Sequence, residues 1–177
     1  MTRFIHLLAV ATYFGATLDF AVVFLPAAEA VDDAALQRRV LARGLKPYNL
    51  ISVGALGVLI VTGASSLTDM KALFGRDYAL LLWPLVRKLS LTFALTMVAT
   101  YISFGIGHRL VRAELGALPV EPEKQRGQIA RMRGAAWLAL ALAAWTTWVG
   151  LGLSRLPGPA TSERRAGVGA ALAPPPA

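Results

Sequence analysis

The chain contains no cysteine, and this absence excludes several kinds of chemistry. Without thiols there can be no disulfides, thiolate metal sites, iron–sulfur clusters or cysteine nucleophiles. Histidine is almost as scarce, since only His6 and His108 are present. Any metal would therefore need histidine, methionine or oxygen ligands.

The sequence motifs of soluble enzymes are missing as well. We find no Gly-rich phosphate loop, no Gly-x-Ser-x-Gly elbow, no His-Glu-x-x-His pair, no EF-hand loop and no strong internal repeat. Charged residues make up only 16% of the 177 residues, whereas 56% are hydrophobic and the mean hydropathy is +0.57. This composition is too apolar for a soluble domain and indicates an integral membrane protein.

Four apolar runs fill most of the chain, and each has close to the 20 or so residues that a membrane-spanning helix needs. They are Ile5 to Ala28, Tyr48 to Leu67, Leu89 to Gly107, and Ala135 to Leu153. We therefore predict an all-α fold, an integral membrane four-helix bundle over residues 1–156. A Pro/Ala/Gly-rich extended tail follows over residues 157–177.

The first run has an alternative interpretation as a cleavable signal peptide, because Arg3 precedes it and small residues lie near its end. However, the run is longer than a typical signal core, and it contains Asp19, which such cores seldom do. We expect this segment to remain in the mature protein.

A further apolar stretch, Tyr78 to Val86, precedes the third run and contains Trp83 and Pro84. Arg87 and Lys88 separate it from Leu89. This pattern predicts an interfacial helix that turns into the membrane at Pro84.

Small residues and tryptophans give two expectations about packing. The second run contains Gly54, Gly57, Gly63 and Ala64, which would let neighbouring helices approach closely, so we expect this span to be buried in the bundle. The tryptophans of the fourth run serve either as interface anchors or as packing surface; they are Trp137, Trp145 and Trp148.

The formal net charge is +8, and the Lys and Arg residues flank the apolar runs. This distribution indicates anionic lipid headgroups as the partner, and no nucleic acid. The connections after the first and third runs carry a slight majority of the cations, which places them in the cytoplasm. We expect a multi-pass protein of the bacterial inner (cytoplasmic) membrane.

The tail from Pro157 to Ala177 has no periodicity that could bury a core, so alone in water it should be disordered. An ordered polyproline-type tail would indicate a protein that holds it. We therefore expect a larger membrane protein complex as partner, contacted through the C-terminal tail and the helix faces.

Ionisable groups near the ends of spans are the first candidates for chemistry. His6 could ligate a haem iron or copper through a neutral imidazole nitrogen, or it could simply sit in the headgroup region. Arg87 and Lys88 should lie on the same side of the membrane as His6. They could hold propionates, or they could extend to lipid phosphates.

Asp19 lies about two thirds of the way along the first run, too deep for its short side chain to reach the interface. It should be paired, protonated or turned to a polar interior, where Thr100, Tyr101 or Ser103 could satisfy it. A structural hydrogen bond and a catalytic proton-carrying role are both open.

His108 ends the third run at the opposite interface, where a helix-end cation is the usual role. His6 and His108 are then a membrane thickness apart and cannot share one metal. A second ligand to a metal at His6 would have to come from a partner chain or from a residue such as Met97.

Three short segments carry a family resemblance over roughly Arg3 to Arg112. They are Phe4-Ile5-His6-Leu7-Leu8 with Gly15 and Phe24-Leu25-Pro26, the Gly57 to Gly63 stretch with Thr62-Gly63, and Trp83 to Leu95 with Arg87-Lys88-Leu89, followed by His108-Arg109. This pattern resembles the CopD-like membrane proteins and the related HemJ-type protoporphyrinogen oxidase group. The resemblance implies haem or porphyrin chemistry with His6 and Lys88 at the matching positions, or copper handling.

Two functions from different classes follow. The chain is expected to be a non-catalytic accessory subunit of a larger respiratory or photosynthetic membrane complex. Alternatively, it binds haem b or a porphyrin as a redox protein, and as an enzyme it would be a HemJ-like porphyrinogen oxidoreductase. The copper alternative lacks a Met- or His-rich cluster.

Overall fold

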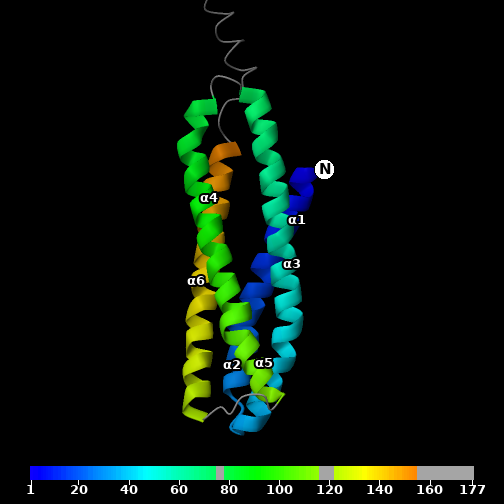
Figure 1. Ribbon diagram of the computed structural model, residues 1–177, viewed down its shortest axis with the longest axis vertical. Helices are drawn as coiled ribbons and strands as arrows, with labels where there is room; N and C mark the ends of the chain where they lie inside the picture. Colours follow the sequence, from blue (N-terminus) through cyan, green and yellow to red (C-terminus); the bar gives the residue numbers. More distant parts are fainter. Residues whose placement is uncertain (75–77, 116–121, 155–177) are drawn as a thin grey trace, which may run out of the picture.

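The computed structural model describes residues 1–74, 78–115 and 122–154, and nearly all of these residues are helical. Four long helical rods run side by side along one axis (Figure 1). Each rod contains a stretch long and apolar enough to cross a membrane: Thr2–Glu29, Ala34–Thr68, Leu82–Arg112 and Lys124–Gly152. The predicted all-α membrane bundle is thus confirmed, while the tail after Ser154 lies outside the described residues.

The rods are built from the following elements. The first comprises α1 (Thr2–Asp19), the π-helix η1 (Phe20–Phe24) and α2 (Leu25–Glu29), and the second is α3 (Ala34–Phe74). The third comprises α4 (Tyr78–Thr100), the π-helix η3 (Tyr101–Gly107) and α5 (His108–Glu114), and the fourth is α6 (Pro122–Ser154).

The turn between the first two rods is fixed by a side-chain cap. The carboxylate of Asp33 accepts a hydrogen bond of 2.9 Å from the backbone N–H of Ala35. The carbonyl of Asp33 accepts a second bond, of 2.8 Å, from the N–H of Gln37. An aspartate at this position satisfies an N–H group that the first helical turn would otherwise leave unpaired, so α3 begins directly after it.

The helices are longer than the apolar runs that predicted them. With 41 residues, α3 is about 60 Å long, roughly twice the thickness of the hydrocarbon layer. Its first turns bury Leu41 and Leu45, so the charged segment before Tyr48 is amphipathic and stays helical. We call this end of the bundle the basic end; its cations include Arg38, Arg39, Arg43, Lys46, Arg109, Arg112, Arg126, Arg131 and Arg133.

The third rod contradicts the expected interfacial helix. α4 runs without interruption from Tyr78 to Thr100, with Pro84 inside it. A proline removes one backbone hydrogen bond, but membrane helices tolerate this where neighbouring groups satisfy the freed carbonyl. The rod also continues through His108 into α5 instead of ending there.

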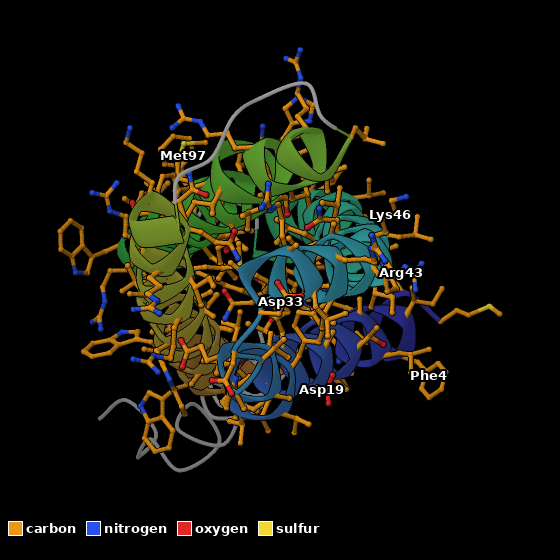
Figure 2. The ribbon with its side chains drawn as sticks, turned by 90° about the horizontal axis from the view of Figure 1, so that it is seen from below. Phe4, Asp19, Asp33, Arg43, Lys46 and Met97 are labelled. Atoms are coloured by element: carbon orange, nitrogen blue, oxygen red, sulfur yellow. The ribbon has the colours of Figure 1, made fainter. Side chains whose placement is uncertain are left out.

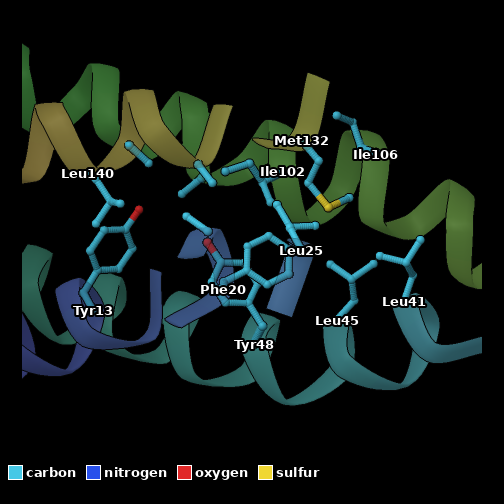
Figure 3. Packing of buried hydrophobic residues seen from close by; sticks show 14 of the residues in the cluster. Tyr13, Phe20, Leu25, Leu41, Leu45, Tyr48, Ile102, Ile106, Met132 and Leu140 are labelled. Atoms are coloured by element: carbon cyan, nitrogen blue, oxygen red, sulfur yellow. The ribbon is translucent and has the colours of Figure 1, made fainter. Parts of the chain in front are cut away.

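The core is a column of buried side chains along the bundle axis (Figure 3). At its centre, the rings of Phe20 and Tyr48 stack with their centroids 4.0 Å apart, and Phe20 also stacks on Phe24 at 5.5 Å. Figure 3 shows Tyr13 beside Leu140 on one side of this stack. The column ties α1 and η1 to α3 and to the other two rods.

The basic end has a polar element in its interior. The amide of Gln125 on α6 donates to Gln37 Oε1 at 2.8 Å and to the carbonyl of Ala34 at 3.1 Å. Gln37 in turn donates to the carbonyl of Ala28 at 3.0 Å. These bonds connect three rods at a level where buried polar groups must be paired.

The second span is oriented differently from our expectation. Gly54, Gly57 and Ala64 are exposed, and nothing lies within 4 Å of a side chain built on either of the two glycines. The buried face of this span consists instead of Ser52, Ala55, Leu56 and Thr62. The small residues therefore face outward.

The tryptophans of α6 also lie on the outside. Trp137, Trp145 and Trp148 are exposed by 51%, 58% and 78%. Their spacing places them on one side of the helix. They do not fill the core, and they are available to lipid or to another protein.

Candidate functional site

A cluster of polar side chains lies where the bundle changes from four helices to two. α1 begins at Thr2 and α6 ends at Ser154, whereas α3 and α4 continue for several more turns (Figure 1). His6 belongs to the first turns of α1, and Gly150 lies in the last turns of α6. Residues in this region are therefore reachable from the membrane surface beside the two longer helices.

The imidazole of His6 is bound to a residue 56 positions away in the sequence. His6 Nδ1 lies 2.7 Å from Thr62 Oγ1 on α3, in a half-buried position. The distance is typical of a hydrogen bond, and the bond joins α1 to α3.

The surroundings of Thr62 determine the direction of this bond. The Thr62 hydroxyl donates to the carbonyl of Val58 at 2.7 Å, with the carbonyl of Leu59 also within 3.3 Å. A hydroxyl has only one proton, so when Thr62 donates it to the Val58 carbonyl, Thr62 accepts from His6 and His6 Nδ1 is the donor. In the neutral ring, Nε2 then holds the lone pair, which is the form that ligates metals or accepts protons.

Lys88 is the cationic member of the cluster. It is half-buried on α4 at about the level of Thr62, since ten residues separate Lys88 from the start of α4 and twelve separate Thr62 from the end of α3. Its Nζ lies 3.6 Å from the position that a Cβ on Gly150 would occupy. The ammonium group therefore extends from α4 towards the end of α6, where a Cβ at position 150 would be in ordinary van der Waals contact with it.

Arg87 does not share this position. Its side chain is exposed, whereas that of the next residue is partly buried. Consecutive helical residues point about 100° apart, so when Lys88 faces the bundle Arg87 faces its outside. Of the two predicted propionate contacts, only Lys88 lies beside His6.

Asp19 is the last residue of α1, and its side chain lies on the outside of the bundle (Figure 2). Its neighbour Phe20 stacks on Tyr48, which follows Lys46 by two residues. Asp19 is therefore close in depth to the first cations of the basic end. The rod continues for ten residues beyond it, to Glu29.

The expected partners of Asp19 are not near it. Thr100 and Tyr101 are exposed on the third rod, and the Ser103 hydroxyl is buried without a hydrogen-bond partner among the described residues. None of the three bonds to the Asp19 carboxylate. The structure therefore does not bring together the predicted proton-carrying group, and Asp19 faces the surroundings.

The remaining candidate ligands are far from His6. His108 is exposed at the start of α5, at the opposite end of the bundle, so the two histidines do not meet. Met97 is nine residues beyond Lys88 on α4, roughly 13 Å along the helix. It lines an outward-facing groove of about 440 Å³ together with Tyr101, Arg131 and Leu138.

Sequence reasoning assigned no role to Thr62 or Gly150, although both lie in the cluster. Thr62 was part of the Thr62-Gly63 pair that carried the family resemblance. Polar residues inside a span can signal such contacts, but Thr62 also bonds to its own helix, as Thr12, Thr92 and Thr146 do. Thr62 differs from these threonines only because α1 packs against its side of α3 and brings His6 within hydrogen-bond distance.

The donor set decides which ligands the cluster could hold. In the described residues no group of three or more His, Asp or Glu side chains converges, so a metal ion held only by such residues has no site there. One imidazole lone pair beside one ammonium fits a ligand that brings its own metal or proton and carries negative charge. Haem and other porphyrins with acid side chains meet both conditions.

The interior below the cluster is filled. Tyr13, two turns along α1 from His6, is only 1% exposed and packs beside Leu140 (Figure 3). A flat ligand would therefore lie at the end of the four-helix section, beside His6 and Lys88, and not in the middle of the bundle. Comparisons of the chain with known protein-family models, with curated proteins and with solved structures found no match.

Proposed function

We propose that the chain is a membrane protein that binds an anionic tetrapyrrole, haem b or a porphyrin, at His6 and Lys88. The observation that carries this proposal is the bond between His6 Nδ1 and Thr62, because it leaves Nε2 as the unprotonated nitrogen. The family resemblance of the segments around His6 and Lys88 agrees with it.

Each residue of the cluster has a distinct task in this proposal. His6 Nε2 would ligate the iron of a haem or accept a hydrogen bond from the ring N–H of a metal-free porphyrin. Lys88 pairs with a carboxylate of the ligand, since no carboxylate of the described chain is paired with it. Thr62 orients the imidazole, and the end of α6 at Gly150 lies against Lys88. The bound group would supply the electron-transfer chemistry.

The test is an absorption spectrum of the chain purified in mild detergent, with and without dithionite, before and after titration with haem. We expect a Soret band in stoichiometric amount for the native chain and for His108→Ala, which removes the distant histidine. His6→Ala should abolish the band, and Lys88→Met should weaken haem binding. A band that survives in His6→Ala would refute His6 as the ligand.

A second function, that of an accessory subunit in a larger respiratory or photosynthetic complex, is supported by the outward-facing glycines of α3. Gly54 and Gly57 leave a shallow strip on the lipid-facing side, and such strips are typical of helix association in membranes. A contribution of the Pro-rich tail to this association stays a prediction, because the tail lies outside the described residues.

This second function is tested by co-purification from the native membrane. The double variant Gly54→Leu/Gly57→Leu should lose a partner that the native chain retains. Gly127→Leu is the matched control, because it also faces open space but belongs to the basic end. Truncation after Leu156 measures the contribution of the tail. If the native chain and all of its variants purify without a partner, the accessory function is contradicted.

A further inference from the structure

A small pocket opens at the basic end, between α3 and α5, and it differs in character from the His6 cluster. Its volume is about 130 Å³, and it is lined by Arg39, Ala42, Arg43, Lys46, Val111 and Leu115. One wall thus carries three cations and the other is apolar. None of the described side chains that line it is acidic.

The cations share one side of α3. Positions 39, 43 and 46 follow the helical repeat of three and four residues, which places the three side chains in one row. Figure 2 shows Arg43 and Lys46 together at one side of the bundle, away from Met97. Within the described ranges, neither Arg43 nor Lys46 forms an ion pair with a carboxylate. Their charges favour an anion from outside the chain.

Beyond Lys46, towards the middle of the bundle, exposed apolar residues follow on the same side of α3. Lys46 is two residues from Tyr48, where the apolar run of α3 begins. Leu50 and Val53 follow on the same side of the helix and are exposed by 78% and 43%. On the neighbouring rod, Phe104 lies two turns above Val111 and is also exposed.

We propose that this pocket binds the phosphate headgroup of an anionic phospholipid, whose acyl chains lie along Leu50, Val53 and Phe104. The planar guanidinium of Arg43 matches two phosphate oxygens at once, and Lys46 supplies a point charge beside it. A soluble phosphate would use the cations alone, whereas a lipid uses both the cations and the exposed apolar strip directly above them. Basic pockets between helices at a membrane boundary are typical sites for such headgroups.

The test counts bound lipid by native mass spectrometry of the full chain in detergent. The probes are phosphatidylglycerol and phosphatidylethanolamine with identical acyl chains, and glycerol phosphate as the soluble headgroup. The variant Arg43→Gln/Lys46→Gln removes two of the cations. The control Arg109→Gln/Arg126→Gln removes the same charge at the basic end from residues that do not line the pocket. Circular dichroism checks that both variants keep their helices.

We expect one phosphatidylglycerol per native chain, with affinity lowered roughly 10- to 30-fold in the pocket variant and changed less than about twofold in the control. An equal loss in both variants would show only general attraction to the basic end and would overturn the proposal. Equal binding of phosphatidylethanolamine would also overturn it. Competition by glycerol phosphate at the same concentration as the lipid would identify a soluble phosphate as the ligand and overturn the lipid assignment.

Discussion

The imidazole of His6 on α1 and the hydroxyl of Thr62 on α3 are 2.7 Å apart, and this hydrogen bond orients the imidazole ring. The bond is local in its geometry but depends on two spans being paired at the correct height. It is therefore a sensitive point at which to test both the packing and the proposed site.

Replacing Thr62 with valine should weaken ligand binding without removing the ligand nitrogen. Valine has nearly the same shape but accepts no hydrogen bond, so His6 loses its fixed orientation. Loss of such an orienting partner lowers affinity about 10- to 100-fold. The measurement is haem titration followed at the Soret band. Thr62→Ser keeps the hydroxyl and is the control; an equal loss in both variants would show that binding depends on the shape of the Thr62 side chain as much as on the bond.

The stack of Phe20 on Tyr48 should be a main contributor to the stability of the bundle. Tyr48→Ala removes a buried ring from the core and should lower the free energy of unfolding by about 3 kcal/mol. Thermal unfolding in detergent, followed by tryptophan fluorescence, measures this loss. Tyr48→Phe keeps the ring, and its effect should be below about 1 kcal/mol. A large loss in Tyr48→Phe would instead assign the stability to the hydroxyl.

Gly44 should not accept a side chain, because a Cβ there would overlap the ring of Phe24. Moving that ring disturbs its stacking on Phe20, so Gly44→Ala should destabilise the bundle by about 1 to 3 kcal/mol. Gly127→Ala, in open space on α6, should instead stabilise its helix by up to about 1 kcal/mol. Chemical unfolding in mixed micelles compares the two. If the overlap with Phe24 is the cause, the double variant Gly44→Ala/Phe24→Ala should lose less stability than the sum of the two single variants.

Two polar contacts at the basic end should differ in strength. Glu29 and Arg133 form an ion pair of 2.8 Å with largely solvated side chains, and Glu29→Gln should change the unfolding free energy by less than about 1 kcal/mol. Gln125 is buried and donates two hydrogen bonds, so Gln125→Ala should cost about 2 kcal/mol. If Glu29→Gln and Gln125→Ala lowered the unfolding free energy equally, water would be satisfying the groups that Gln125 leaves unpaired.

The absence of cysteine makes the membrane orientation directly measurable. We expect the basic end to face the cytoplasm, because it carries most of the cations near the spans. In intact cells, a membrane-impermeant maleimide should label Lys71→Cys at the other end but not Ala35→Cys. Permeabilising the membrane that holds the protein should make both react. Labelling of Ala35→Cys in intact cells would reverse the assigned orientation.

Much of the candidate site could be predicted because span order alone assigns residues to one end of the bundle. Antiparallel helices with an even number of crossings place His6 and Lys88 on the same side, and His108 on the other, as the structure shows. The partners of these residues could not be predicted in this way. Thr62 and Gly150 depend on how each helix is rotated about its axis, and span order contains no information about rotation.

The sequence by itself determined that the chain is all-α, that it has four membrane-spanning helices, and which residues lie at each end. The physical reason is that lipid offers no hydrogen bonds to the backbone, so long apolar runs must be helical. Only the tertiary structure decided which faces point inward: Gly54 and Gly57 turned out to face outward, and so did Asp19 and Arg87. In a membrane both the core and the surroundings are apolar, so hydrophobic periodicity does not distinguish the buried face of a helix from its lipid-facing one.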